Sequence, residues 1–85
     1  MTFSISWHPQ AFKRLEKLPK TVIERVVKKM DVVADDPFRY LEHFETDNVF
    51  KLRIGEYRAL IDIDPKTHTI LIQEFDHRGR MYKRM

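Results

Sequence analysis

The sequence predicts an α+β fold with the element order β-α-α-β-β-β, in which a two-helix hairpin packs on one face of a mainly antiparallel sheet. Two observations favour this fold. Apolar residues recur at helical spacing through residues 11–33, and they alternate with polar residues through much of residues 50–75. With 85 residues and no cysteine, the chain is expected to form one domain, residues 1–85, without disulfides.

The first strand is predicted over residues 2–7, where three apolar side chains alternate with threonine and serine. Pro9 follows it, and proline is well suited to the first turn of a helix. A short helix is predicted next. Its apolar face is formed by residues at helical spacing, namely Ala11, Phe12, Leu15 and Leu18.

The second helix is predicted to begin near Pro19, with Thr21 and Glu24 spaced as a capping box and Pro19 as an alternative first residue. Its apolar stripe consists of Val22, Ile23, Val26, Val27, Met30 and Val33. Pro37 should end the helix, because the residue before a proline avoids the helical conformation. Residues 37–48 are predicted to form an acidic linker with room for one helical turn.

Three hairpin-linked strands should complete the sheet. Alternating residues 50–54 and 57–63 flank Gly55-Glu56, which is typical of a two-residue hairpin turn. A second turn is predicted over residues 64–68. The strand after it, residues 69–75, carries apolar residues on both faces, and this predicts an interior position.

One face of the predicted hairpin gathers three cations. A turn at Gly55-Glu56 places Arg53 opposite Arg58, with Lys51 two residues along on the same face. Like charges directly opposite each other destabilise a hairpin. We interpret the face as a surface for a polyanion, with nucleic acid the first candidate. The alternative is a set of solvated cations that splay apart and are screened by salt.

The charge is distributed unevenly along the chain. The net charge is +3, and residues 77–85 contain no acid but four cations, Arg78, Arg80, Lys83 and Arg84. No apolar run reaches the length of a membrane span, and no His, Asp or Glu spacing is typical of a metal site. We therefore expect a soluble cytoplasmic protein with no metal, no small-molecule cofactor and no membrane partner.

Three segments together resemble the RelE/ParE superfamily of toxins from toxin–antitoxin systems, and the resemblance covers nearly the whole chain. They are the helix hinge Leu18-Pro19-Lys20, residues 51–58 (KLRIGEYR) and residues 77–82 (HRGRMY). The chain is most similar to the RelE branch of mRNA-cleaving toxins, because a set of four residues is present: Lys51, Arg58, Arg78 and Tyr82. The resemblance implies a RelE-like fold and a cognate, acidic RelB-like antitoxin that covers the helices and the basic face.

The resemblance also implies a reaction. The toxin would enter the ribosomal A site and cut mRNA without a metal, by attack of a ribose 2′-OH on the adjacent phosphate. Lys51 would act as the base or as its electrostatic substitute, and Arg58 would brace the scissile phosphate. Arg78 would stabilise the transition state or protonate the leaving oxygen, and Tyr82 would stack on a base or orient the 2′-OH.

Several assignments stay open at this point. An ordinary lysine is protonated at neutral pH, so His77 is a second candidate for the acid or base. Four further cations are expected to contact RNA, namely Arg53, Arg80, Lys83 and Arg84. Two other functions compete with the nuclease: a ParE-like inhibitor of gyrase, and a catalytically silent relative that binds only antitoxin or RNA.

Overall fold

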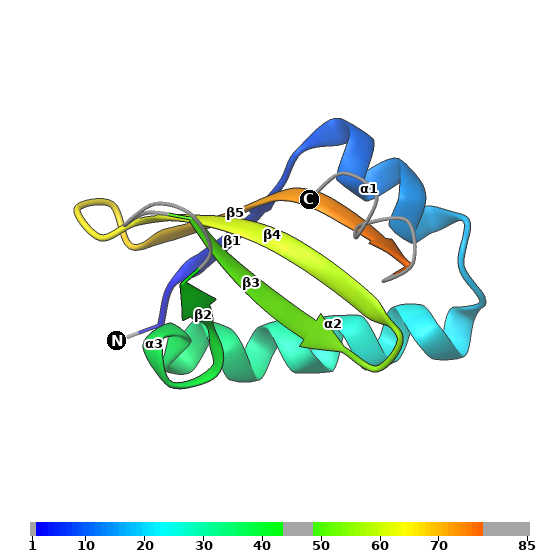
Figure 1. Cartoon of the computed structure of the whole chain (residues 1–85), viewed down its shortest axis with the longest axis horizontal. Helices are drawn as coiled ribbons and strands as arrows, with labels where there is room; N and C mark the ends of the chain where they lie inside the picture. Colours follow the sequence, from blue (N-terminus) through cyan, green and yellow to red (C-terminus); the bar gives the residue numbers. More distant parts are fainter. Residues whose placement is uncertain (1, 44–48, 78–85) are drawn as a thin grey trace.

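The computed structural model describes residues 2–43 and 49–77, which form a five-stranded sheet and three helices (Figure 1). In chain order the elements are β1 (Ser4–Trp7), α1 (Pro9–Glu16), α2 (Lys20–Asp35), α3 (Pro37–Tyr40), β2 (Glu42–His43), β3 (Val49–Ile54), β4 (Tyr57–Asp64) and β5 (Thr69–His77). The strand order is β1-β5-β4-β3-β2, and only the β1–β5 pair is parallel among these strands. The predicted α+β fold is confirmed, including the interior position of β5.

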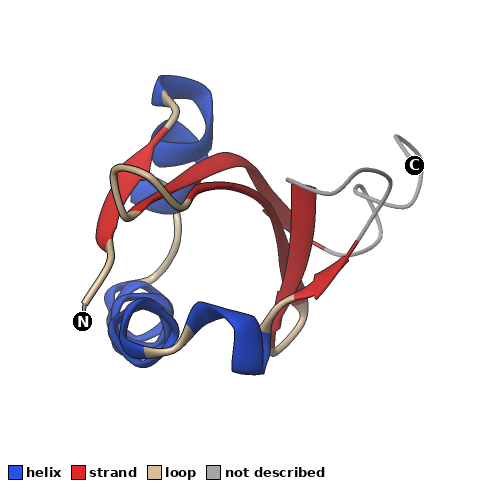
Figure 2. Ribbon diagram, turned by 90° about the vertical axis from the view of Figure 1, so that its left-hand side faces the viewer, coloured by secondary structure: helices blue, strands red, loops and turns tan. Residues whose placement is uncertain are grey.

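Both predicted helices pack on the sheet. The sheet is curved, and α2 runs along its concave side (Figure 2). Strand β1 ends at Trp7, opposite Ile72, and α1 then lies beside the remainder of β5. One continuous core joins these elements. Its largest fully buried side chains are Phe75, Ile61, Ile70, Ile72, Val26 and Val33.

The helix starts differ in part from the prediction. Pro9 is the first residue of α1, as expected. The predicted capping box at the start of α2 is wrong, because α2 begins at Lys20 and has no side-chain cap. The carbonyl of Pro19 already accepts hydrogen bonds from the N–H groups of Val22 and Ile23, at 2.9 and 3.0 Å. Thr21 therefore lies inside the helix, where its side chain cannot serve as the N-cap.

The segment before the hairpin contains the expected helical turn, α3, and one element that the sequence pattern does not reveal. Strand β2 is two residues long and pairs antiparallel with β3. This pairing places Glu42 directly opposite Lys51. A strand of two residues is too short to show an alternating pattern, so the sequence carries no signal for it.

The β3–β4 hairpin has the predicted register. Gly55 adopts a φ of 58°, a left-handed conformation that glycine tolerates, and Ile54 pairs with Tyr57 across the turn. Arg53 pairs with Arg58, as expected. Lys51 lies on the same face, since side chains alternate along a strand.

A bulge in β5 decides which side chains face these cations. Ala59 and Leu60 pair with Phe75 and Glu74, but Ile61 pairs with Ile72, so Gln73 is an extra residue. Regular alternation from Ile72 would direct residues 74 and 76 into the core. The bulge reverses that order, which buries Phe75 and places Asp76 on the outer face.

Candidate functional site

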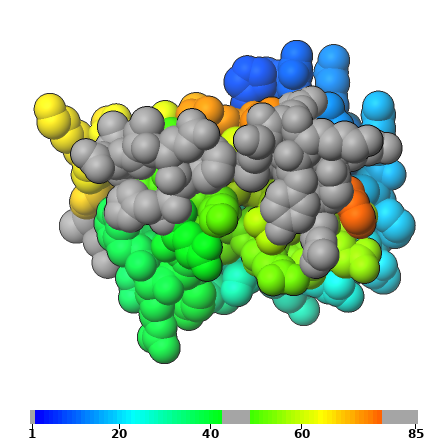
Figure 3. Space-filling model, viewed as in Figure 1, coloured from blue at the N-terminus to red at the C-terminus, as the bar shows by residue number. Residues whose placement is uncertain are grey.

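Three predicted site residues gather on the outer face of the β3–β4 hairpin. Lys51 and Arg58 are partly buried, whereas Arg53 is exposed. They border a hollow of about 200 Å³ whose full lining is Lys29, Tyr40, Glu42, Lys51, Leu52, Arg53 and Arg58. On the surface shown in Figure 3, the atoms of α3 and β2 lie beside those of the hairpin. The hollow is thus formed by α2, the α3–β2 segment and the hairpin together.

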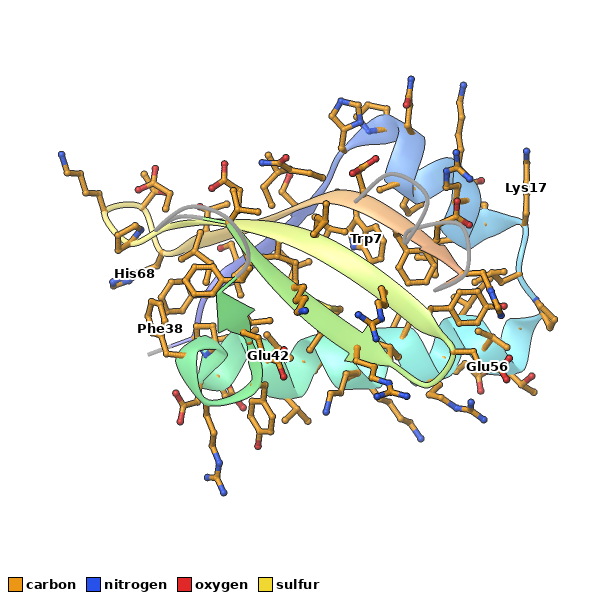
Figure 4. All side chains as sticks on the ribbon, viewed as in Figure 1. Trp7, Lys17, Phe38, Glu42, Glu56 and His68 are labelled. Carbon is orange, nitrogen blue, oxygen red and sulfur yellow. The ribbon has the colours of Figure 1, made fainter. Side chains whose placement is uncertain are left out.

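One side of the hollow carries a loose ion pair. The Nζ atom of Lys51 lies 3.9 Å from the Oε2 atom of Glu42, whose side chain is 76% exposed. Figure 4 shows Glu42 beside the hairpin, away from the turn that Glu56 marks. Exposed pairs of this kind contribute little to stability. Lys51 can therefore exchange Glu42 for a phosphate at small cost.

Lys29 and Tyr40 form the wall of the hollow next to α2. The Nζ atom of Lys29 lies 5.0 Å from the centre of the Tyr40 ring, which is within the range of a cation–π contact. This contact adds an ammonium group and an aromatic ring to the lining. Both kinds of group are used to bind single-stranded nucleic acid.

A row of charged residues crosses the sheet at the turn end of the hollow. Arg53, Arg58 and Asp76 pair in register across β3, β4 and β5. Beyond β5, the Nη1 atom of Arg14 on α1 donates to the Oδ2 atom of Asp76 at 2.6 Å. Like charges therefore face each other between β3 and β4, where the two arginines meet. Opposite charges face each other between β4 and β5 and between β5 and α1.

His77, the second candidate for acid or base, lies elsewhere. It pairs with Tyr57, and the two rings meet edge to face with their centres 5.7 Å apart. Its Nε2 atom is 3.6 Å from the Oε2 atom of Glu56 at the hairpin turn. Tyr57 and His77 alternate with Arg58 and Asp76 along their strands, so they project to the opposite face. The structure does not bring His77 together with Lys51 and Arg58.

The comparisons with known proteins agree on one family. Residues 5–82 match the family model described as the ParE toxin of type II toxin–antitoxin systems, parDE. The chain belongs to the RelE/ParE superfamily of type II toxins. The resemblance inferred from the sequence is thereby confirmed.

Relatives of this toxin include both sequences and solved structures. Toxin RelG of Mycobacterium tuberculosis is 30% identical, over 99% of this chain and 100% of that protein. The toxin–antitoxin complex RelBE2 of M. tuberculosis matches with a TM-score of 0.81 and 27% identity, covering 92% of this chain and 100% of the other. The archaeal RelE–RelB complex of Pyrococcus horikoshii matches with a TM-score of 0.80 and 28% identity, covering 94% and 99%.

Five residues predicted for the toxin's site lie outside the described residues, namely Arg78, Arg80, Tyr82, Lys83 and Arg84. Within residues 2–43 and 49–77, no group of His, Asp and Glu side chains is arranged to hold a metal ion. No helix in that same part of the toxin is long and apolar enough to cross a membrane.

The sequence patterns did not predict two acidic residues of the site. Glu42 reaches the hollow only through the pairing of β2 with β3. Asp76 reaches the row of arginines only through the bulge at Gln73. A signal for the bulge was present, because apolar positions 70, 72 and 75 break strict alternation. Both carboxylates reduce the repulsion among Lys51, Arg53 and Arg58 that the hairpin sequence alone predicts.

Proposed function

We propose that this toxin is a ribosome-dependent endoribonuclease that cuts mRNA in the ribosomal A site without a metal. One observation carries the proposal: Lys51, Arg53 and Arg58 share one face and border one hollow. Such a group of cations suits the phosphodiester backbone of RNA. The similarity to toxin RelG and to RelE proteins supports the same assignment.

The proposed reaction breaks one bond to phosphorus for the one that it forms. The ribose 2′-oxygen forms a bond to the adjacent phosphorus, and the bond from phosphorus to the 5′-oxygen breaks. The proton of the 2′-OH must be accepted, and the departing 5′-oxygen must gain one. Negative charge on the phosphoryl oxygens grows in between, and cations held in place stabilise it.

Within this proposal Lys51 and Arg58 have distinct roles. Lys51 pairs loosely with an exposed carboxylate, so it is available to the 2′-OH as a base or as an electrostatic substitute. Arg58 is partly buried and lies opposite Arg53 and Asp76 on the neighbouring strands, a position in the middle of the face that suits it to bracing the scissile phosphate. The position of His77 beside Tyr57 and Glu56 favours Lys51 over His77.

The C-terminal residues complete the proposed site. Arg78 would stabilise the transition state or protonate the leaving oxygen, and Tyr82 would stack on a base or orient the 2′-OH. Arg53, Arg80, Lys83 and Arg84 would contact the RNA backbone. Removal of any one of these last four should weaken binding and its dependence on salt, with less effect on the chemical step.

A RelB-like acidic antitoxin is the proposed partner that neutralises the toxin. The similar solved structures from M. tuberculosis and P. horikoshii are toxin–antitoxin complexes, the second with RelB. An acidic segment would complement the face that carries Lys51, Arg53 and Arg58. Ribosome and mRNA would then compete with the antitoxin for that face.

A ParE-like inhibitor of gyrase is the second candidate, because the matching family model carries the ParE description. In that function Lys51 and Arg78 would be bystanders. The two candidates separate on expression: a nuclease arrests growth with cleaved ribosome-bound mRNA, whereas a gyrase inhibitor damages DNA and leaves mRNA intact. Growth without arrest, in cells that hold folded toxin, would indicate the silent relative.

The deciding experiment uses purified toxin and ribosomes programmed with a defined mRNA. We expect cleavage by the wild type and a loss of roughly 10²–10³-fold in rate for Arg58→Ala, the usual effect of removing one transition-state donor. Lys66→Ala is the matched control, because Lys66 is an exposed cation in the β4–β5 turn, outside the hollow. Intact mRNA with the wild type, or equal losses in both variants, would contradict the proposal.

A further inference from the structure

We propose that Asp76 is a positioning residue for Arg58, which holds the Arg58 guanidinium in the orientation that an RNA phosphate requires. The inference rests on the proposed nuclease function and adds to its site a carboxylate that touches no RNA. Asp76 is the only charged residue that is buried among residues 2–43 and 49–77, with 8% of its surface exposed. A buried carboxylate is costly unless cations and hydrogen bonds compensate it.

Two cations flank Asp76, one from each side. Arg14 on α1 donates from Nη1 to the Oδ2 atom of Asp76 at 2.6 Å. Arg58 lies directly opposite on β4, where paired residues of an antiparallel sheet have Cβ atoms about 4.5–5.5 Å apart. Asp76 therefore forms an ion pair with a cation of the first helix and places its carboxylate at the position opposite a cation of the candidate site.

The conformation of Asp76 is fixed by its own contacts. Its Oδ1 atom accepts a hydrogen bond from the N–H of His77 at 2.8 Å, while Arg14 occupies Oδ2. Both oxygens are thus held by groups that belong to β5 and α1. A carboxylate held in this way provides a fixed negative charge beside Arg58, which a free surface acid could not.

The repulsion between Arg53 and Arg58 explains why Arg58 needs a fixed negative charge beside it. Arg53 lies opposite Arg58 on the other side, and two guanidinium groups repel each other. Repulsion from Arg53 and attraction to Asp76 both favour a position of the Arg58 side chain close to β5. A guanidinium has five N–H donors in a planar fork, so one edge can face the carboxylate while the other remains available to a phosphate.

The alternative is that Asp76 only attaches α1 to β5 through Arg14. Arg14→Gln separates the two roles, because it removes the helix partner and leaves Asp76 opposite Arg58. Asp76→Asn keeps the shape of the side chain and removes the negative charge that faces both Arg14 and Arg58. Asp76→Glu keeps the charge. All three variants are compared in the full chain, with thermal unfolding as a measure of folding.

The first measurement is the NMR signal of the Arg58 Nε–H group, which needs no activity. We expect it to move in Asp76→Asn and to stay near the wild-type position in Arg14→Gln. The second is single-turnover cleavage of ribosome-bound mRNA. Asp76→Asn should lower the maximal rate by roughly 10–100-fold, as misplacement of a catalytic group does, while the half-saturating ribosome concentration changes less than about twofold. Asp76→Glu should recover part of the rate.

Two results would overturn the proposal: an unchanged Arg58 signal in Asp76→Asn, or equal loss of rate in Asp76→Asn and Arg14→Gln. If Asp76→Asn does not fold, Arg58→Ala gives the reciprocal test. The side-chain carboxyl signal of Asp76 should then move, and an unmoved signal refutes the proposed coupling between the two side chains. Absence of cleavage by the wild type would refute the nuclease function instead, and the NMR signals would still decide the role of Asp76.

Discussion

Arg53 on β3 and Arg58 on β4 lie directly opposite each other, so two guanidinium groups occupy one cross-strand position. Replacing the exposed Arg53 with threonine should stabilise the fold by about 0.2–1 kcal/mol, because it removes a like-charge pair and adds a good strand former. The same change should weaken RNA binding and reduce its dependence on salt. Urea unfolding and a salt titration of RNA affinity measure the two effects.

The Arg53→Thr result has a clear control. Arg39→Thr removes an exposed cation on the helix α3, which therefore has no cross-strand position. The stability of Arg39→Thr should equal that of the wild type or lie below it. Its loss of RNA affinity should be smaller than that of Arg53→Thr. A loss of stability in Arg53→Thr that matches the loss in Arg39→Thr would show that the opposed arginines do not strain the hairpin.

At the proposed RNA-binding face, Glu42 would compete with phosphate for Lys51. Glu42→Gln should change the free energy of unfolding by less than about 1 kcal/mol, since the pair is exposed and its atoms are 3.9 Å apart. RNA affinity should rise, and the gain should shrink as salt increases. Glu24→Gln, the same charge change on the exposed face of α2, is the control and should give a smaller gain. Equal gains would mean that only net charge matters.

Gly55 sets the geometry of the hairpin turn. Its φ of 58° lies in the left-handed region, so Gly55→Ala should destabilise the fold by about 1–2 kcal/mol. Added bulk is not the cause, because a Cβ would meet its nearest atom, Nη1 of Arg25, at 3.7 Å. Gly55→Asn should cost less, since asparagine enters this region more readily. Equal losses in chemical unfolding would contradict the explanation from backbone conformation.

Asp64 gives the β4–β5 turn a dependence on pH. The backbone N–H of Lys66 donates to its carboxylate at 3.0 Å and lowers the pKa of Asp64 below its usual value of 3.8. A lowered folded pKa stabilises the fold above the unfolded pKa, and that stabilisation disappears as the pH falls through the folded value. Asp64→Asn should therefore be less stable than the wild type at neutral pH. In strong acid, thermal unfolding should give nearly equal stabilities for Asp64→Asn and the wild type.

The fold and half of the candidate site were predictable because they follow from local patterns. Period-two alternation on both sides of Gly55-Glu56 determined the hairpin register, and that register alone brought Arg53 to Arg58. The position of α2 followed from its apolar stripe and from Pro37. These features depend on neighbours in the chain, which a sequence displays directly.

The remaining features depend on contacts between distant segments. Thr21 and Glu24 have the spacing of a capping box, but Pro19 occupies the N-cap position and the helix begins at Lys20. Asp76 joins Arg14 and Arg58 only after the bulge at Gln73 has reversed the faces of β5 and α1 has docked beside that strand. No local pattern encodes a meeting of three elements, so Asp76 could not be recognised as part of the site.

The parallel pairing of β1 with β5 joins the start of the chain to its last described strand. A growing polypeptide therefore cannot complete this sheet until residues 69–72 have emerged from the ribosome, because the strand that β1 pairs with does not yet exist. Ile70 and Ile72 arrive at the same moment and fill the centre of the core. Packing of the toxin's core is thus delayed until β5 has been made, however early β1 and the helices emerge.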